Sequence, residues 1–198
     1  MAAKDANECD VLVIGSGASG MSAAVSAAAH GLKVLIIEKE PKFGGTTARS
    51  GGWLWIPGTS LAKAWGIQES PDLARTYLRH EAGNSFDSAR VDAFIEHGPK
   101  AVDFFITKTS VRFDMPMVFP DYHAEAPGGT QGGRSMVARP FDGRELGTNI
   151  KNLGAADGLP PVDWATVIDK LDAGSAPAPD AHNARTTWLT TVNPTPVR

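Results

Sequence analysis

Short apolar runs and helix-forming segments alternate along the first forty residues. Residues 11–14 (VLVI) and 34–37 (VLII) are continuous runs rich in β-branched side chains, typical of strands buried on both faces of a sheet. The alanine-rich segment from Met21 to His30 predicts a helix whose small side chains let it lie close to that sheet. Gly31 is placed to end the helix. The pattern predicts a strand–turn–helix–strand unit with parallel strands.

Three further helices are predicted from apolar stripes at helical spacing. The first covers residues 71–82, because Ser70 and Pro71 form an N-cap followed by proline at the first helical position. The second begins near residue 88 and stops at Gly98-Pro99, and the third covers residues 100–107. We interpret their aromatic and aliphatic residues as core.

The sheet begun at Val11 is not finished by the rest of the sequence. A doubly wound domain needs about five strands, and no second pair of Val/Ile-rich runs of strand length follows Glu38. The nearest candidates, residues 102–106 (VDFFI) and 165–171 (ATVIDKL), fit helices better. The sequence predicts an α/β, Rossmann-like fold that is incomplete, with a helical insertion and an irregular C-terminal tail.

Gly15, Gly17 and Gly20 form a G-x-G-x-x-G motif between the first predicted strand and helix, and Glu38 ends the next strand. In this context the motif is typical of a dinucleotide site: the glycines allow a tight turn, close approach of a pyrophosphate and close helix–strand packing. The helix N-terminus offers its amides to the phosphates, and Glu38 is expected to bind a ribose and to disfavour NADP. The alternative is a glycine-rich turn without a ligand.

A second glycine-rich loop, residues 44–52 (GGTTARSGG), has too few side chains to fill space. We interpret it as a second backbone segment close to the same extended ligand, which would then be FAD; the alternative is an ordinary surface loop. The expected cofactor contacts are Gly15, Gly17, Ala18, Ser19, Gly20, Glu38, Lys39, Gly44, Gly45, Thr46, Thr47, Ser50, Gly51 and Gly52.

Composition and charge exclude several other classes of protein. The net charge of −3 disfavours nucleic-acid binding, and the single cysteine excludes an internal disulfide framework and a CxxC metal site. His123 has no partner at metal-ligand spacing, so no metal site is expected. The N-terminus has neither a signal peptide nor a membrane-spanning run, which predicts a cytoplasmic protein.

Three segments together resemble the flavoprotein family of fumarate reductase and succinate dehydrogenase, and within it most of all the 3-ketosteroid Δ1-dehydrogenases. They are VLVIGSGASGMSAA, IIEKEPKFGGTTARSGGWLWIPG and FPDYHAEAPGGTQGGRSMVARPFDGRELG, from about Cys9 to Gly147. The resemblance implies a GR2-type FAD-binding fold and an FAD-dependent oxidoreductase that removes a proton and transfers a hydride to flavin N5 from a CH–CH bond of a steroid-like ketone. It also implies Tyr122 as a catalytic tyrosine that works with a second tyrosine further along the chain; on the local sequence alone, the alternative is an interfacial tyrosine with its hydroxyl in water. The resemblance also implies dissociable FAD, because residues 44–52 lack the histidine of members with covalently attached flavin.

Beyond Gly147 the resemblance ends. We therefore expect residues 9–147 to form the N-terminal part of an FAD-binding domain and residues 148–198 to be an irregular tail, with one short amphipathic piece around residues 164–171. A truncated or frameshifted reading frame would produce such a tail, and little turnover is expected of the isolated chain. Two alternatives stay open: a fumarate-reductase-like enzyme and a non-catalytic FAD-binding fragment. Arg134, Arg139 and Arg144 are expected to form structural ion pairs in loops.

Overall fold

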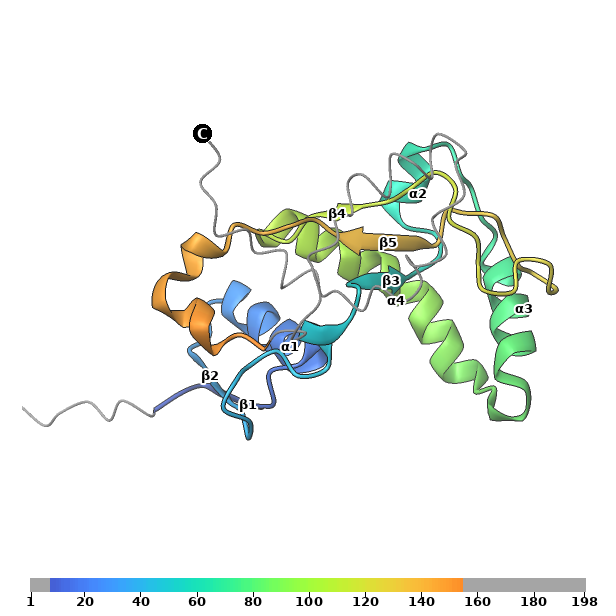
Figure 1. Ribbon diagram of the computed structural model, residues 1–198. Coiled ribbons are helices and arrows are strands. Elements are labelled where there is room, and N and C mark those ends of the chain that lie inside the picture. Colours follow the sequence, from blue (N-terminus) through green and yellow to red (C-terminus); the bar gives the residue numbers. More distant parts are fainter. Residues whose placement is uncertain (1–7, 155–198) are drawn as a thin grey trace, which may run out of the picture. The chain divides into compact units, whose positions relative to one another are not determined.

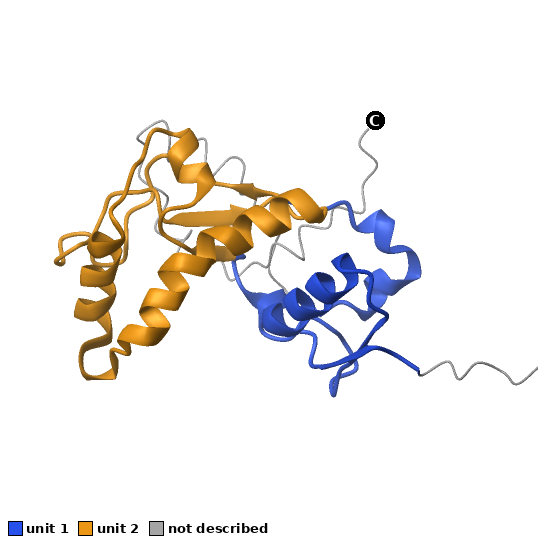
Figure 2. Cartoon of the chain, turned by 180° about the vertical axis from the view of Figure 1, so that it is seen from behind, with its two compact units in different colours: residues 1–52, 140–162, 184–198 blue, residues 53–139, 163–183 orange. Residues whose placement is uncertain are grey.

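A computed structural model describes residues 8–154 of the chain (Figure 1). The described residues form two compact units, which Figure 2 shows in different colours. Unit 1 comprises residues 8–52 and 140–154, and unit 2 comprises residues 53–139. No helix in this part of the chain is long and apolar enough to cross a membrane.

Unit 1 contains the predicted strand–helix–strand segment. Strands β1 (Val11–Ile14) and β2 (Val34–Ile37) pair in parallel, with Val11 opposite Val34, and helix α1 (Ala18–Ala29) contacts both strands. Gly31 follows the end of α1 with a φ of +84°, and its amide donates to Ala28 O, so the prediction that it ends the helix is confirmed. Unit 1 also contains the 3₁₀ helices η1 (Thr47–Arg49) and η3 (Gly143–Asn152).

The prediction that these two strands are buried on both faces is wrong for the described part. Val13 is buried, but Leu12 and Ile14 on the other face of β1 are 52% and 80% exposed. Successive side chains of a strand point to opposite faces, so α1 can cover only one of them. Within residues 8–154 no element covers the opposite face of β1.

Unit 2 is built on an antiparallel sheet that the sequence did not predict. Its strand order is β3–β5–β4, with Trp53 opposite Val137 and Phe113 opposite Ala138. The strands have two to four residues, too few for an alternating pattern to be recognised. Buried Ala62, Val102, Met115 and Met136 form the core beneath them. The strands are β3 (Trp53–Trp55), β4 (Phe113–Asp114) and β5 (Ser135–Ala138).

The two long helices of unit 2 follow the predicted pattern except at Pro99, whereas its short helical segments at residues 60–64 and 83–85 were not predicted. Helix α3 begins at Pro71 as predicted, with Ser70 Oγ accepting a hydrogen bond from the Asp72 amide. Residues 88–107 form one helix instead of two. Gly98 explains this, because it has no β-carbon to clash with the following Pro99. Gly98 also packs closely against Ile56: a β-carbon at position 98 would lie 2.9 Å from the Ile56 side chain. The helices are α2 (Ser60–Ala64), α3 (Pro71–Ala82), η2 (Gly83–Ser85) and α4 (Ser88–Lys108).

The first residues of the predicted tail belong to unit 1. Helix η3 crosses the predicted boundary at Gly147, and Leu153 just after it pairs with Phe43 in an isolated parallel bridge. Leu153 also packs against buried Ala48. The amphipathic piece at residues 164–171 lies outside the described residues, and the division into residues 9–147 and 148–198 stays a prediction.

Candidate functional site

The three glycines of the turn between β1 and α1 are required for three different reasons. Gly15 has a φ of +95°, a conformation that other residues rarely adopt. A β-carbon on Gly20 would lie 1.9 Å from Gly15 O, so only glycine allows this approach of helix and turn. Gly17 has an ordinary φ of −71°, and the nearest atom to a β-carbon there, beyond its chain neighbours, would be Thr47 Oγ1 at 3.9 Å. The fold itself therefore does not require glycine at position 17, and the space beside it is open to a ligand.

Ser16, in the same turn, joins both glycine loops to Glu38. It is buried, its amide donates to Glu38 Oε2 at 2.8 Å, and its hydroxyl donates to the same oxygen. The hydroxyl also accepts a hydrogen bond from the Gly44 amide at 2.9 Å. One side chain thus fixes the acid at the end of β2 and the start of the second loop.

Glu38 is held in its ionised form by these donors. The Ser16 hydroxyl, followed by the amides of Glu40 and Ser16, lowers the pKa of Glu38 from 4.5 to about 2. The Glu40 amide binds Oε1 at 3.1 Å, while Ser16 binds Oε2. A carboxylate accepts about four hydrogen bonds, so Glu38 keeps acceptor capacity for ligand hydroxyls.

The N-terminus of α1 faces the second glycine loop. Thr47 Oγ1 accepts a hydrogen bond from the Ala18 amide at 3.0 Å, and the Gly17 N-cap provides no side-chain hydrogen bond of its own. The amides of Ser19 and Gly20 lie in the first turn, where a helix has no internal acceptors. They and the positive end of the helix dipole suit an anion. The Thr47 hydroxyl still has its proton to donate.

Some predicted cofactor contacts lie together and others do not. A β-carbon on Gly45 would be 3.4 Å from Gly17 Cα, so the two loops are adjacent, and Gly44 is buried against Ala48. The Ser50 hydroxyl is used inside its own loop, donating to Thr47 O at 2.9 Å and accepting from the Gly52 amide at 3.2 Å. Lys39 and Thr46 are exposed, and Gly51 and Gly52 lead into β3.

Tyr122 lies in unit 2, on the loop between β4 and β5, and is 91% exposed. Its neighbour Asp121 is buried and accepts hydrogen bonds from Trp55 Nε1 at 2.6 Å, from the Thr130 amide at 3.0 Å and from Arg134 Nη1 at 2.6 Å. The backbone beside Tyr122 is therefore anchored while its phenol remains accessible.

The expected ion pairs of the three arginines are confirmed. Arg134 pairs with Asp121 and Glu69, Arg139 with Asp114, and Arg144 with Asp142. Only the first group is buried: the Arg134 side chain is fully covered. His123 pairs with Glu81 at 2.8 Å, and no cluster of metal-ligating side chains occurs among residues 8–154.

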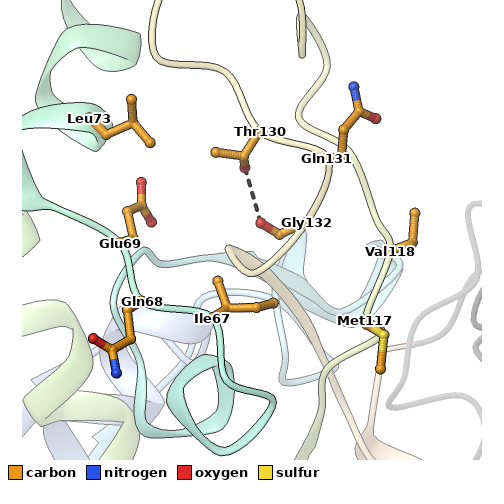
Figure 3. A pocket seen from close by; sticks show the side chains of 9 residues that line it. All are labelled: Ile67, Gln68, Glu69, Leu73, Met117, Val118, Thr130, Gln131 and Gly132. Atoms are coloured by element: carbon orange, nitrogen blue, oxygen red, sulfur yellow. Dashed lines mark hydrogen bonds between the residues drawn. The ribbon is translucent and has the colours of Figure 1, made fainter.

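Unit 2 also has an open, mainly apolar cavity of about 280 Å³ (Figure 3). Leu73 of α3 and the exposed side chains of Met117 and Val118 line it, with Glu69 and Thr130. Because Glu69 binds Arg134 and Thr130 binds Asp121, this cavity borders the buried ion pairs next to Tyr122.

Sequence reasoning missed Ser16 and Asp121. Ser16 occupies a variable position of the glycine motif, and Asp121 is one of two acids in an irregular segment. A small hydroxyl residue directly after the turn glycine was the only signal for Ser16. The sequence carried no signal for Asp121, because its hydrogen-bond partners are up to 66 residues away.

Comparison with known proteins agrees with this geometry. The chain is 42% identical over 156 residues to a 3-oxosteroid 1-dehydrogenase of Mycobacterium tuberculosis, covering 79% of this chain and 28% of that protein. It is 45% identical over 139 residues to a 4-oxocyclohex-2-ene-1-carboxylate 5-dehydrogenase of Sinomonas cyclohexanicum, covering 70% of this chain and 23% of that one. The chain thus spans only about a quarter of the length of these relatives.

A solved structure is also similar to this chain. It is a 3-ketosteroid Δ1-dehydrogenase from Sterolibacterium denitrificans in complex with 1,4-androstadiene-3,17-dione, with a TM-score of 0.67 and 31% identity over 91% of this chain and 35% of that one. The resemblance predicted from the motifs is confirmed, but its predicted end at Gly147 is wrong, because the family match continues beyond this residue. A family model described as FAD binding domain matches residues 10–194. Because that match covers most of the residues, the chain belongs to the FAD binding domain family.

Proposed function

We propose that this chain binds the ADP part of FAD in an enzyme that dehydrogenates a CH–CH bond next to a carbonyl. The substrate class is a cyclic ketone of the steroid type, in keeping with the names of the relatives. The observation that carries the proposal is the open space at Gly17. It lies between the N-terminus of α1, where Gly17 provides no side-chain cap, and a second glycine loop that Ser16 and Thr47 tie to that turn.

The residues present fit an adenosine diphosphate group. The amides of Ser19 and Gly20 would hold the pyrophosphate, which could approach because Gly17 has no side chain. Glu38, ionised over the whole physiological pH range, would accept hydrogen bonds from the ribose. The loop at residues 44–47 would lie along the ligand on its flavin side. Residues 44–52 contain no histidine, which supports dissociable FAD.

In the proposed reaction a C–H proton and a neighbouring hydride leave the substrate, and a carbon–carbon double bond forms between the two carbons. FAD, when bound, supplies the hydride acceptor. Tyr122 is the proposed acceptor of the proton from the carbon that the ketone acidifies, and its exposure leaves the phenol oxygen accessible to the substrate. A second proton-transfer residue and the carbonyl-polarising donors would lie outside residues 8–154.

The finer features of the fold belong to the same proposal. The exposed Leu12, Ile14 and Ile37 of β1 and β2 support a Rossmann-like sheet of the GR2 type that further strands complete. The length of the relatives supports a larger protein as the active unit. A cytoplasmic location stays a prediction from the sequence.

Flavin retention tests the proposal most directly. The purified chain is mixed with FAD, desalted and measured by its visible flavin absorbance, alongside Gly17→Ala. We expect the unaltered chain to retain flavin and Gly17→Ala to lose it, while the two have the same thermal midpoint without FAD, because the added methyl group meets no protein atom closer than 3.9 Å. Ala28→Ser, which also adds one heavy atom but on the exposed end of α1, is the matched control and should retain flavin. Equal retention by Gly17→Ala would count against the proposed ligand position.

A further inference from the structure

The loop that carries Tyr122 is held on both sides of this residue by buried groups of unit 2. Before it, the Asp121 amide donates to Thr130 O at 3.0 Å, and the Asp121 carboxylate accepts the Thr130 amide in return. After it, the His123 amide donates to the hydroxyl of buried Tyr77 at 3.4 Å. Tyr122 itself is the exposed residue between two anchored neighbours.

The anchor of Asp121 is a buried ion cluster. Arg134 binds Asp121 through Nη1 and Glu69 through Nε at 2.8 Å, and its Nη2 also donates to Gly128 O at 2.8 Å. The three side chains are 0%, 1% and 7% exposed. The guanidinium lies 5.3 Å from the ring centres of Trp55 and Tyr77, and Trp55 also donates to Asp121.

Such a cluster is not explained by stability alone. Buried ion pairs are often no more stabilising than apolar side chains of the same volume, because desolvation opposes the attraction of the charges. What this cluster does provide is a fixed backbone path for a loop that has no regular secondary structure between residues 115 and 134. Its hydrogen bonds reach three separate points of that loop, at Asp121, Gly128 and Thr130.

We propose that Trp55, Asp121 and Arg134 are positioning residues for Tyr122. They fix the backbone next to it so that the phenol is presented at a defined place without being buried. The consequence for catalysis rests on the proposed function of Tyr122, whereas the consequence for loop order does not.

Amide hydrogen exchange of the full chain tests the positioning itself. Trp55→Phe removes the indole donor to Asp121 but keeps a ring against Tyr77 and Phe94, and Asp121→Asn removes the charge at nearly constant volume. We expect exchange at the amides of residues 121–130 to become on the order of tenfold faster in both variants. Asp92→Asn, which removes the charge of one of the two exposed carboxylates paired with Arg75, is the control and should leave these amides unchanged.

Tyrosine labelling gives a second, independent result. The chain has two tyrosines, Tyr77 and Tyr122, so fluorotyrosine labelling yields two resonances that a Tyr77→Phe variant assigns. The Tyr122 resonance should broaden or shift in Trp55→Phe and not in Asp92→Asn. If neither exchange nor this resonance changes in Trp55→Phe and Asp121→Asn, the positioning inference is wrong.

Turnover, measured in a longer FAD-loaded protein that contains this chain, separates this inference from the proposed function. A misplaced base should lower kcat in Trp55→Phe with KM nearly unchanged, while Tyr122→Phe should lose turnover almost entirely. Full activity of Tyr122→Phe would mean that Tyr122 is not a catalytic residue. The exchange result would then decide whether Trp55, Asp121 and Arg134 position this loop. If Tyr122→Phe is inactive while Trp55→Phe keeps its kcat and its amide exchange, Tyr122 retains its catalytic role and the positioning inference is wrong.

Discussion

The two units fix their irregular loops by opposite means. In unit 1 the glycine loops are joined by backbone amides, two hydroxyl groups and the carboxylate of Glu38, and space remains next to Gly17. In unit 2 the Tyr122 loop is fixed by buried charges packed against aromatic rings, and the Arg134 side chain is fully buried. The loop that we propose to admit a ligand is fixed by small polar groups, whereas the loop that we propose to present Tyr122 is fixed by buried charged and aromatic side chains.

Breaking the buried cluster should have the largest effect. Arg134→Met leaves the carboxylates of Asp121 and Glu69 covered and without their cation, which should lower the free energy of unfolding by about 3–5 kcal/mol. Urea denaturation measures this. The control is Arg139→Met, which removes the half-exposed pair with Asp114 and should change stability by about 0–1 kcal/mol. Similar losses in both variants would contradict the contrast between buried and exposed pairs.

Gly20→Ala should have the second-largest effect on stability, and unlike Gly17→Ala it should change the fold as well as flavin binding. A β-carbon on Gly20 would overlap Gly15 O, so α1 must shift, and we expect a loss of about 1–3 kcal/mol together with loss of flavin binding. Gly17→Ala should lose flavin binding at unaltered stability. Thermal unfolding without FAD separates the two. Equal stability of both variants would mean that the turn is looser than its geometry indicates.

Removing the Ser16 hydroxyl should separate the two glycine loops of unit 1. In Ser16→Ala the buried Gly44 amide loses its acceptor, a cost of about 1–3 kcal/mol, and the pKa of Glu38 should rise from about 2 toward 4.5. Carboxyl carbon NMR during a pH titration follows the second effect. Ser50→Ala is the matched control, since the Ser50 hydroxyl bonds only within its own loop and should leave Glu38 unchanged. A Glu38 pKa that does not move in Ser16→Ala would contradict the role of this hydroxyl.

The parts of the fold that the sequence predicted are those fixed by neighbouring residues. Strands β1 and β2 are continuous apolar runs next to a glycine turn, and α3 begins with a Ser-Pro cap, so each carries its signal locally. The β3–β5–β4 sheet pairs Trp53 with Val137 and depends on the burial of Met136. Strands of two to four residues stabilised by such distant contacts have no local pattern to read.

The candidate site divides in the same way. The spacing of Gly15, Gly17, Gly20 and Glu38 predicts a dinucleotide site because the motif is itself a local arrangement. Ser16 acts on Glu38 and Gly44, 22 and 28 residues away, and its importance appears only when these are brought together. The single helix through Pro99 was also missed by sequence reasoning, since Gly98 packs against Ile56, a residue distant in sequence.

The smallest expected effect is the pH dependence that Glu38 gives to unit 1. Its pKa is lower in the folded chain, about 2, than its ordinary 4.5, so its hydrogen bonds stabilise the fold above about pH 4.5, and this contribution is lost as the pH falls from 4.5 toward 2. Glu38→Gln cannot titrate and should show a shallower loss of stability over that interval, with no difference in slope between pH 6 and 8. Urea midpoints of both chains from pH 2 to 8 measure this. If the stability curves of the two chains are parallel over the whole pH range, Ser16 does not favour the ionised form of Glu38. The Ser16 hydroxyl would then join the two glycine loops without lowering the pKa of Glu38.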